Sequence, residues 1–311
     1  MDCKALALPE ELLIVGGAVE AGIFNALREG ALPRQKLPDA VRADRRALDA
    51  VVDALAALGY LKVNEDQVAI TPEAWNVFFN EEHPGYLGFS FMHAYTRLKT
   101  WIRLPEILRT GEAPPKERSP ERLQYFMEAM RHNARKIAPR VVDLCLEGMH
   151  IPLEVLDVGG GPLNYATVFA ARGARVTVLD TPEVVAHMQA RVPPGAAVRL
   201  VAGDFTRELP EGPYDLAFLG NVTHIYGPEE NQALLHRLDR VLCPGGRVAI
   251  LDVVYGLSPR APFMRVNMLV SSRGGGAWTL EQYTAWLAGA GFSIPRVQHI
   301  DFRQLLIAEK V

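Results

Sequence analysis

The sequence has few of the features that mark disulfide-rich, zinc-binding or nucleic-acid-binding proteins. Its three cysteines, Cys3, Cys145 and Cys243, lie far apart and lack Cys-x-x-Cys spacing, so neither a disulfide framework nor a zinc site is expected. The net charge of -3 and the pI near 6.3 offer no electrostatic attraction for nucleic acid or for an anionic membrane surface. We therefore expect buried free thiols, no bound metal, no nucleic-acid or membrane partner, and a small molecule as the natural ligand.

Long apolar runs and a leader-like beginning are also absent. No uninterrupted apolar stretch is long enough to span a bilayer, and the first dozen residues contain three acidic residues, Asp2, Glu10 and Glu11, which a secretory signal would not. Hydrophobic residues nevertheless make up 49% of the 311 residues, enough for a buried core in one large or two smaller domains. These features predict a globular cytoplasmic protein.

The most informative stretch is residues 153–163, where an apolar run reaches Asp157 and breaks into consecutive glycines. From Asn164 onward, apolar residues recur at helical spacing. The stretch therefore predicts a strand, a tight turn and the start of a helix, an arrangement that can cradle a nucleotide. A dinucleotide fingerprint needs Gly-x-Gly-x-x-Gly; Gly159 and Gly161 fit, but Asn164 fills the last position, which disfavours nicotinamide cofactors. Asp157 suits a ligand with ammonium and sulfonium charges, such as S-adenosylmethionine. A purely structural turn is the alternative, because glycine-rich strand exits are common in α/β folds.

The N-terminal part of the chain has the pattern of a winged helix. Apolar residues recur at helical spacing from 9 to 27, and further helices are expected at 36–41 and 44–59. Two alternating runs around a polar turn predict a hairpin at 60–70. Winged helices often bind DNA, so a DNA-binding regulator is one hypothesis for the function.

Three arginines at the start of the third expected helix bear on that hypothesis. Arg42, Arg45 and Arg46 lie where a recognition helix would be basic. The residues that follow, 47–58, are too apolar to offer a face that reads a DNA groove. We therefore interpret the arginines as a solvated helix start.

Residues 83–148 are predicted to be helical, with breaks at Pro105 and at Pro114-Pro115. Aromatic and methionine side chains recur here at helical spacing, among them Phe126 and Met127. Such a stripe is usually part of a core. The alternative is that it forms one wall of an apolar pocket.

From residue 149 onward strands and helices alternate, the pattern of a parallel sheet with helices on both faces. The second strand run ends in Asp180, about twenty positions after the glycines, where a carboxylate is placed to accept hydrogen bonds from ribose hydroxyls. The third run ends in Gly203-Asp204-Phe205, whose carboxylate and ring suit an adenine amino group and base. Each acid alone is typical of a strand end, but three acids at successive strand ends predict one ligand site.

Four further strands are expected at 214–219, 247–253, 296–300 and 304–308. A tight turn at Asp301-Phe302 joins the last two, so the closing hairpin places an antiparallel strand in an otherwise parallel sheet. The predicted fold class is α/β. It comprises a Rossmann-like, seven-stranded, mostly parallel sheet with an antiparallel last strand, preceded by an all-helical, winged-helix N-terminal domain.

Together these motifs resemble those of the two-domain S-adenosylmethionine-dependent O-methyltransferases, a family of plant phenolic and bacterial polyketide and pigment enzymes. The resemblance covers nearly the whole chain. Its specific motifs are Leu156-Asp157-Val158-Gly159-Gly160-Gly161, Val178-Leu179-Asp180-Thr181-Pro182-Glu183-Val184, Gly203-Asp204-Phe205 and Pro244-Gly245-Gly246-Arg247.

The resemblance implies a division of the chain into three parts. These are a winged-helix dimerisation domain at 1–90, linking helices at 91–148 that contribute to the substrate pocket, and a class I S-adenosylmethionine-binding methyltransferase domain at 149–311. It also implies a homodimer formed through the N-terminal domain, which does not read DNA in that family.

The same resemblance implies roles for individual residues. The cofactor-binding positions correspond to Asp157, Gly159, Gly160, Gly161, Asp180, Asp204, Phe205 and Asn221. His224 lies where many members carry the base that removes the proton of the substrate hydroxyl. Because a phenol has a pKa of about 10, such a base typically contributes about 10² to 10⁴ in rate at neutral pH. Met130 matches a position that often touches substrate, and His93 and Trp278 are further candidates.

Three departures from the family pattern concern the site. Leu163 stands where the glycine turn usually ends with one more glycine, so its side chain either crowds the cofactor or points into the sheet. Arg265 stands where many members carry an acid, so the carboxylate that often assists the histidine is expected to be absent. The stretch 274–279, Gly-Gly-Gly-Ala-Trp-Thr, differs from the charged residues usual there.

The sequence therefore predicts an enzyme that moves a methyl group from S-adenosylmethionine to a hydroxyl of a small, apolar, aromatic molecule, with His224 as general base. The expected lack of an acid partner leaves carbon methylation, or another reaction that retains the cofactor, as an alternative. A winged-helix DNA-binding regulator that senses S-adenosylmethionine is the second alternative.

Overall fold

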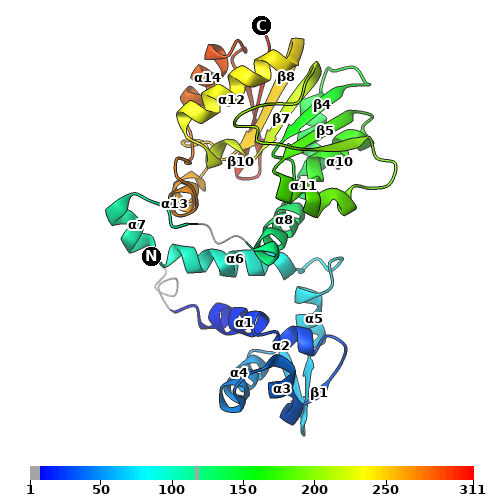
Figure 1. Cartoon of the computed structure of the whole chain (residues 1–311), viewed down its shortest axis with the longest axis vertical. Coiled ribbons are helices and arrows are strands. Elements are labelled where there is room, and N and C mark those ends of the chain that lie inside the picture. The colour runs from blue at the N-terminus through cyan, green and yellow to red at the C-terminus, as the bar shows by residue number, and fades with distance from the viewer. Residues whose placement is uncertain (1–7, 116–118) are drawn as a thin grey trace. The chain divides into compact units, whose positions relative to one another are not determined.

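The computed structural model describes residues 8–115 and 119–311 (Figure 1). The chain divides into two compact units, Met1–Leu98 and Lys99–Val311. Within the described ranges, no helix is both long and apolar enough to cross a membrane. Cys145 is buried and Cys243 is partly exposed, both as free thiols, whereas Cys3 lies outside the described residues.

The first unit contains the hairpin that the sequence predicts, but its first predicted helix is divided. The run expected to form one helix at 9–27 forms two, α1 (Glu10–Glu20) and α2 (Ile23–Ala26), because Gly22 between them adopts a left-handed conformation with a φ of 80°. The other elements that begin in this unit are β1 (Leu32–Pro33), η2 (Arg34–Lys36), α3 (Leu37–Val41), α4 (Arg45–Ala57), β2 (Leu61–Asn64), β3 (Gln67–Ile70), α5 (Pro72–Phe78) and α6 (Gly88–Trp101).

A small antiparallel sheet and the packed helices form the core of the first unit. β3 pairs with β2 as the predicted hairpin, with Leu61 opposite Ile70, and also with the two-residue β1, which no sequence pattern indicated. α4 begins as predicted after Asp44, whose carboxylate accepts a hydrogen bond of 2.9 Å from the Ala47 amide. The helix turns Val52 into the core, where it is 0% exposed.

Three helices open the second unit: α7 (Leu104–Thr110), α8 (Pro120–Ala134) and α9 (Ala138–Leu146). Pro105, expected to break a helix, lies in the first turn of α7, where its missing amide costs no hydrogen bond. The methionine and aromatic stripe on α8 is divided, because Met127 is buried in the core, Met130 is partly buried and Phe126 is 38% exposed. The stripe is therefore core over only part of its length.

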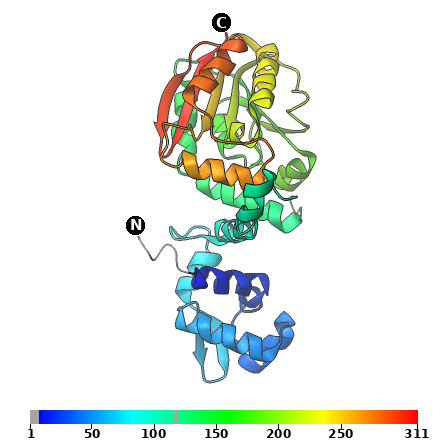
Figure 2. The ribbon, with the colours of Figure 1, turned by 90° about the vertical axis from the view of Figure 1, so that its left-hand side faces the viewer.

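In the described part of the second unit, a seven-stranded sheet lies at the centre (Figure 2). Its strands are β4 (Glu154–Val158), β5 (Arg175–Asp180), β6 (Val198–Ala202), β7 (Tyr214–Gly220), β8 (Leu242–Asp252), β9 (Arg296–Ile300) and β10 (Arg303–Glu309). They lie in the order β6-β5-β4-β7-β8-β10-β9, and all pairs are parallel except those that β10 makes with β8 and β9. The predicted α/β fold class with an antiparallel last strand is confirmed.

β8 begins at Leu242 rather than at the expected residue 247. Its first residues include Pro244-Gly245-Gly246. The pairing with β7 shifts register between Tyr214 and Leu216, and it becomes regular where Leu216 lies opposite Arg247. The glycine pair therefore forms an irregular entry to the strand.

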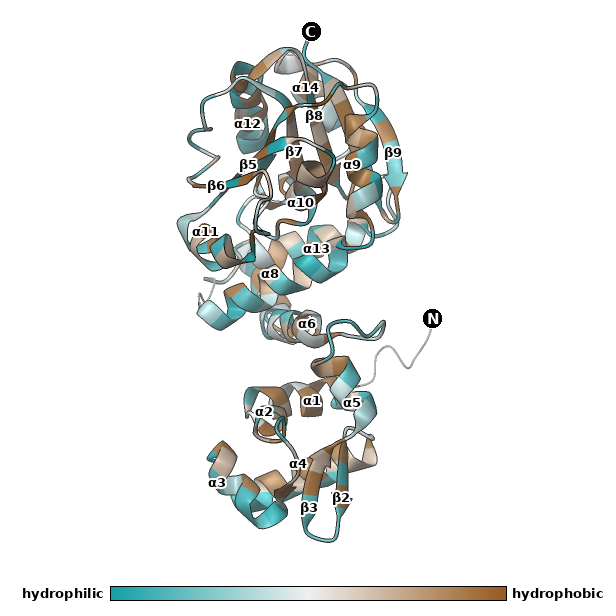
Figure 3. Ribbon diagram, turned by 90° about the vertical axis from the view of Figure 1, so that its right-hand side faces the viewer, coloured by the Kyte–Doolittle hydropathy of each residue, from teal (hydrophilic) through white to brown (hydrophobic). Residues whose placement is uncertain are grey.

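Helices cover both faces of the sheet. α9 and α10 (Asn164–Ala171) pack on one face, and α12 (Pro228–Val241) and α14 (Leu280–Gly289) pack on the other (Figure 3). Figure 3 shows mostly hydrophobic central strands between helices that carry hydrophilic residues. The remaining elements of this unit are α11 (Pro182–Met188), η3 (Gln189–Arg191), η4 (Thr223–Ile225) and α13 (Ala261–Ser271).

The side chains of each strand alternate between two apolar cores. On β10, Leu305 and Ile307 belong to the core under α9 and α10, whereas Leu306 and Ala308 belong to the core under α12 and α14. Because the parallel strands all end at the same edge of the sheet, the loops that follow them gather there. The predicted site residues of this sheet lie at that edge.

Candidate active site

Asp157 lies near the end of β4, against the glycine turn. The residue is 1% exposed, and neither carboxylate oxygen has a hydrogen-bond partner among the described residues. A Cβ atom at Gly160 would lie 2.3 Å from the carboxyl carbon of Asp157, so only glycine lets the turn pass over the acid. A buried carboxylate without a partner is costly, and a positively charged group at this place would compensate it.

The rest of the turn is tied to Asp180 at the end of β5. The Gly161 amide donates a hydrogen bond of 3.0 Å to one carboxylate oxygen, and the Thr181 amide donates one of 2.7 Å to the other. A Cβ at Gly161 would lie 2.7 Å from the first of these oxygens and 2.5 Å from Val184 Cγ1, and Gly159 has a φ of 69°. Glycine is therefore required at these positions by close contact or by backbone conformation.

The two acids beside the turn share an apolar environment. Burial raises the pKa of Asp157 to about 8, and the neighbouring charge of Asp180 adds to that rise. Burial also raises the pKa of Asp180, although its hydrogen bonds from the Thr181 and Gly161 amides act in the opposite direction. Two carboxylates that resist ionisation in this way favour a ligand that carries positive charge.

Leu163, which closes the turn, packs away from it. The residue is 3% exposed and belongs to the same apolar core as Ala166 and Phe169. Its φ of 64° is left-handed, a conformation that costs a non-glycine residue roughly 1–2 kcal/mol. The burial of the side chain offsets that cost. Of the two expectations for this position, the structure agrees with the one in which the side chain points into the core.

Asp204 and Phe205 follow β6 and are held by local contacts. One oxygen of Asp204 accepts hydrogen bonds from the amide and the hydroxyl of Thr206, and the other lies 3.3 Å from Nε of Arg207. The bond from the Thr206 hydroxyl contributes most to lowering the pKa of Asp204. The Phe205 ring is 7% exposed and meets the Tyr226 ring edge-on, with 5.5 Å between the centroids. The Asp204 side chain is 53% exposed and is therefore accessible to a ligand.

His224 follows β7 and pairs with an acid that is not among the predicted site residues. Its Nδ1 lies 2.7 Å from Oδ1 of Asp252, the last residue of β8. Because a carboxylate only accepts, Nδ1 carries the hydrogen, and Nε2 of the neutral ring keeps its lone pair. No described residue pairs with Nε2. The expectation that the histidine has no acid partner is therefore wrong.

The missed acid had a signal in the sequence. Asp252 ends an apolar strand run in the same way as Asp157 does, and the pattern that indicated one acid applies equally to the other. The position that drew attention instead, Arg265 on α13, lies with its guanidinium carbon 5.1 Å from the centroid of the Tyr255 ring. Its stacking on an aromatic ring explains the cation there without reference to the histidine.

Asp252 is the centre of a buried hydrogen-bond network. It is 0% exposed, and one oxygen accepts from the Thr223 hydroxyl at 2.6 Å and from the His224 amide at 3.1 Å. The other oxygen also accepts from the Val253 amide at 2.7 Å. Because the Thr223 hydroxyl donates to Asp252, the Tyr283 hydroxyl at 2.7 Å is the donor to Thr223. Burial raises the pKa of Asp252, but His224 and these hydrogen bonds outweigh it and hold the pKa below its ordinary value.

The backbone carbonyl of Thr223 is held by two further side chains. It accepts a hydrogen bond of 3.0 Å from the Trp278 indole and one of 2.9 Å from the Asn231 amide. Asn231 is 1% exposed and also donates to the carbonyl oxygens of Tyr226 and Gly227. Trp278 thus supports the segment that carries the histidine, and its ring packs against the core under α12 and α14.

The glycine run at 274–276 lets a second chain segment approach His224. The His224 carbonyl accepts a hydrogen bond of 2.9 Å from the Gly276 amide. A Cβ at Gly275 would lie 2.3 Å from the same carbonyl oxygen, so a side chain there would push the two backbones apart. The departure from the family pattern at this stretch therefore has a physical reason, which is the close contact with the histidine segment.

The remaining predicted residues lie in different places. Asn221 follows β7 with a φ of 60°, and its side-chain oxygen accepts a hydrogen bond of 3.0 Å from Nε of Arg303. Met130 lies partly buried on α8. His93 lies on α6 in the first unit, where burial and the charge of Arg97 lower its pKa to about 4. The second unit thus gathers the predicted cofactor residues and His224 at the carboxyl ends of its parallel strands.

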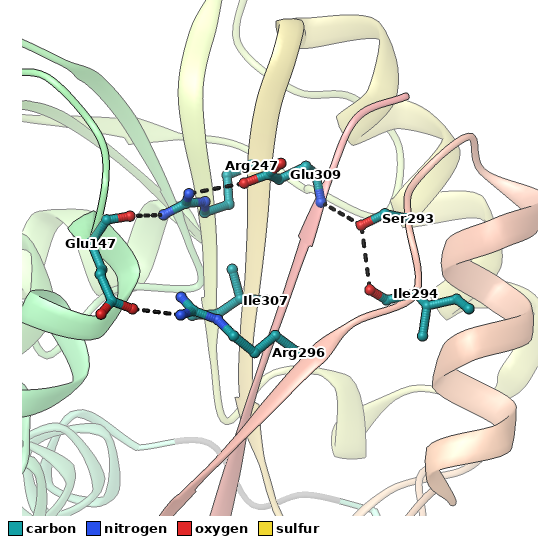
Figure 4. A pocket seen from close by; sticks show the side chains of 7 residues that line it. All are labelled: Glu147, Arg247, Ser293, Ile294, Arg296, Ile307 and Glu309. Carbon is teal, nitrogen blue, oxygen red and sulfur yellow. Dashed lines mark hydrogen bonds and ion pairs between the residues drawn. The ribbon is translucent and has the colours of Figure 1, made fainter.

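A separate pocket of about 320 Å³ lies toward the end of the sheet where the parallel strands begin (Figure 4). Its charged side chains pair with each other, Arg247 with Glu309 at 3.0 Å and Arg296 with Glu147. No residue named so far as part of the candidate active site lines this pocket. Among the described residues, no group of three or more His, Cys, Asp or Glu side chains is placed to hold a metal ion.

Known proteins resemble this chain over most of its length. A family model described as an O-methyltransferase domain matches residues 112–293. The chain is 29% identical over 304 residues to the tetracenomycin polyketide synthesis 8-O-methyl transferase TcmO of Streptomyces glaucescens, covering 91% of this chain and 88% of TcmO. It is 26% identical over 311 residues to the N,N-dimethyltransferase OxyT of Streptomyces rimosus, covering 91% of this chain and 88% of OxyT.

A solved structure shares the fold. The structure of PigF with SAH superposes with a TM-score of 0.76 and 22% sequence identity, covering 96% of this chain and 96% of that chain. PigF is an S-adenosyl-L-methionine-dependent methyl transferase of a Serratia species.

Proposed function

This chain belongs to the S-adenosylmethionine-dependent O-methyltransferase family, and on that basis we propose that it methylates a hydroxyl of a small, apolar, aromatic molecule with His224 as the general base. The observation that carries the proposal is the contact of 2.7 Å between His224 Nδ1 and Asp252 Oδ1. This contact orients the ring and leaves Nε2 to accept a proton, at the same edge of the sheet as the glycine turn.

The glycine turn and its neighbours fit the cofactor. The turn lacks room for a Cβ at Gly160, and the buried Asp157 carboxylate has no partner among the described residues. The ammonium and sulfonium charges of S-adenosylmethionine are of the sign that would compensate it. Asp180 suits the ribose, and Asp204 with Phe205 suits the adenine. The proposed cofactor-binding residues are Asp157, Gly159, Gly160, Gly161, Asp180, Asp204, Phe205 and Asn221.

Residues of the chain accept the proton and orient the reacting groups. Nε2 of His224 accepts the proton of the substrate hydroxyl as the oxygen attacks, and Asp252 stabilises the imidazolium that results. Bound S-adenosylmethionine supplies an electrophilic methyl group. Thr223 holds Asp252 in place through its hydroxyl, at 2.6 Å, so the carboxylate cannot turn away from the histidine without losing that bond. Fixed orientation of the reacting groups contributes further to the rate.

The substrate pocket and the assembly belong to the same proposal. We assign Met130, His93 and Trp278 to substrate binding, and residues 1–90 to a winged-helix domain that forms a homodimer. Residues 91–148 then link that domain to the methyltransferase domain at 149–311. The similarity to TcmO, a polyketide synthesis 8-O-methyl transferase, supports a small-molecule hydroxyl as the acceptor.

Calorimetry and one substitution test the proposal. The wild-type protein is expected to bind S-adenosylmethionine, and His224→Ala is expected to lower kcat on a panel of naphthols by about 10² to 10⁴. Binding of the cofactor to this variant should change by less than about twofold. His236, which is exposed on α12, offers a matched control, and His236→Ala should change neither quantity. An unchanged kcat in His224→Ala would remove the base assignment, and a wild-type protein that did not bind the cofactor would contradict the proposal as a whole.

The similarity to OxyT, an N,N-dimethyltransferase, favours nitrogen as a second candidate acceptor. A neutral amine attacks through its own lone pair and loses a proton after the transfer. His224 can accept that proton, and the cofactor site is the same, so the geometry serves both reactions. Mass spectrometry of the product locates the new methyl group. A methyl on nitrogen or carbon would contradict the hydroxyl acceptor. Binding to DNA fragments that weakens steeply with salt would instead favour a regulator.

A further inference from the structure

Arg303 brings a positive charge to the edge of the sheet that carries the glycine turn. It is the first residue of β10, and because this strand runs antiparallel to β8, β10 begins where the parallel strands end. Its neighbour Gln304 lies opposite Asp252. Nε of Arg303 donates a hydrogen bond of 3.0 Å to the side chain of Asn221, which follows β7. Since β8 lies between β7 and β10, the arginine side chain reaches across a whole strand.

The guanidinium group has donors that the protein does not use. The residue is only partly exposed, and its guanidinium carbon lies 4.2 Å from the centroid of the Phe302 ring. In the part of the chain that the structure describes, no atom accepts a hydrogen bond from the two terminal nitrogens. Burial lowers the pKa of Arg303, although the nearby Tyr165 and Asp252 oppose the shift. The lowered pKa means that burial destabilises the charged guanidinium more than its charged neighbours stabilise it.

Arg303 and Asp157 lie on the face of the sheet that α10, the helix carrying Tyr165, covers; Asp157 is two residues from Val155, which belongs to that core. Leu305 and Ile307 face the core that contains Tyr165. Arg303 lies two residues before Leu305 on β10, so its side chain points to the same face of the sheet. Tyr165 is 7% exposed, and its hydroxyl has no partner among the described residues. Burial raises the pKa of Tyr165, the charge of Arg303 lowers it and that of Asp157 raises it, so both charges lie within electrostatic reach of this hydroxyl.

Arg303 and Asp157 face the same side of the sheet and both act on the Tyr165 hydroxyl. Their opposite charges match those of an amino-acid headgroup, in which an ammonium and a carboxylate are bonded to the same carbon. We propose that Arg303 binds the carboxylate at the methionine end of the cofactor, with Asn221 positioning the guanidinium and Asp157 compensating the ammonium. The free terminal nitrogens form the planar fork that pairs with a carboxylate. The inference rests on the proposed function and deepens it, because it assigns a residue of the closing hairpin to the cofactor site.

Two ligands that differ only by the carboxylate test the inference. They are S-adenosylhomocysteine and its decarboxylated form, S-adenosyl-3-thiopropylamine, and calorimetry on the full chain gives the ratio of their dissociation constants. The wild-type protein is expected to prefer S-adenosylhomocysteine by about 10- to 100-fold, the range for hydrogen bonds to a charged group. Arg303→Gln should reduce this ratio to within about threefold. Arg303→Lys keeps the charge but loses the fork, so an intermediate ratio is expected.

A matched control and a measure of folding make the test decisive. Arg240 is exposed on α12, and Arg240→Gln should keep the wild-type ratio. Thermal unfolding followed by circular dichroism shows whether each variant folds, and Arg303→Lys decides by the same ratio if Arg303→Gln does not. A ratio that stays at the wild-type value in the Arg303 variants would overturn the inference alone. A wild-type protein that bound neither ligand would overturn the proposed function and the inference together.

Discussion

Asp157 and Asp252 lie at the carboxyl ends of two parallel strands of one sheet, and both are almost completely buried, at 1% and 0% exposed. Asp157 has no hydrogen-bond partner among the described residues, whereas Asp252 is surrounded by donors from Thr223, His224 and Val253. The pKa of Asp157 is raised to about 8, while the pKa of Asp252 is held below its ordinary value. Two acids that are equally buried therefore have pKa values shifted in opposite directions.

The difference teaches that the partners of a buried acid, rather than its burial, decide whether it ionises. The half of the site around His224 is completed by the protein itself, and the proposed role as general base needs this because such a group must keep one orientation. The half around the glycine turn is incomplete without a positive charge. We interpret the contrast as that between the proposed catalytic group, which the fold organises in advance, and the proposed cofactor site, which the ligand would complete.

The largest expected effect concerns Asp157 and pH. Its folded-state pKa of about 8 exceeds the ordinary aspartate value of about 3.9, so between these values the folded state binds more protons than the unfolded state, and stability falls as the pH rises. The slope is at most about 1.4 kcal/mol per pH unit, or up to roughly 4 kcal/mol between pH 5 and pH 8. Asp157→Asn removes this pH-dependent contribution to the free energy of unfolding. Urea unfolding of the ligand-free proteins at several pH values measures the difference.

Asp252→Asn serves as the contrasting variant for this experiment. Because the pKa of Asp252 is lowered, the stability it contributes is present above the unfolded-state pKa and is lost only as the pH falls through the folded-state pKa. The titration of Asp252 itself therefore contributes no difference in slope between wild type and Asp252→Asn from pH 5 to pH 8. If the curves of wild type and Asp157→Asn ran parallel over that range, the account of Asp157 as an unpaired buried acid would be incorrect.

The second effect is the cost of Asp252→Asn itself. An asparagine amide presents a donor where the carboxylate accepts, so either the Val253 amide or the Thr223 and His224 donors lose their acceptor. We expect a loss of about 2 kcal/mol in the free energy of unfolding at pH 7, measured by urea unfolding. The kcat should fall by roughly 10² or more, because the amide can donate to Nδ1 and so place the hydrogen on Nε2.

A partly exposed acid gives the matched control for Asp252. Asp239 lies 3.2 Å from Lys310, and its side chain is 36% exposed. Asp239→Asn should cost less than about 1 kcal/mol and leave kcat unchanged, since a surface ion pair contributes little. Equal losses in the two variants would argue against a special role for the buried network.

The smallest effect is expected from Tyr283→Phe. Its hydroxyl donates to Thr223, which remains bonded to Asp252 when that donor is lost. We expect a loss of about 1 kcal/mol in the free energy of unfolding and a decrease of a few-fold in kcat, measured in the same assays. Tyr255, which is 38% exposed, provides a control, and Tyr255→Phe should have neither effect. A Tyr283→Phe variant identical to wild type would limit the network to Thr223, His224 and Asp252.

Most of the fold follows from local patterns. The hairpin at Asp301-Phe302 and the antiparallel β10 were predictable because apolar alternation and a tight turn suffice to indicate them. The break at Gly22 was not, since apolar spacing continues across it from Val19 to Ile23. β1 escaped prediction because two residues carry no periodicity.

The two halves of the site also differ in how far apart their residues lie in the sequence. Asp157, the glycines and Asp180 are joined by short-range contacts within one strand-turn-helix unit and its neighbour, so their motifs were visible in the sequence. The network around Asp252 joins residues that are 29 and 60 positions apart, Thr223 to Asp252 and Thr223 to Tyr283. No local pattern relates such residues to one another.

The sequence by itself determined the alternation of strands and helices, the glycine turn with its acids, and the position of His224 after a strand. Periodicity and glycine placement act over a few residues, which is why these features could be predicted. Only the tertiary structure decided that Asp252, rather than an acid at position 265, faces the histidine. The physical reason is the order of the strands, which places β8 beside β7 and so brings the end of one against the loop that follows the other.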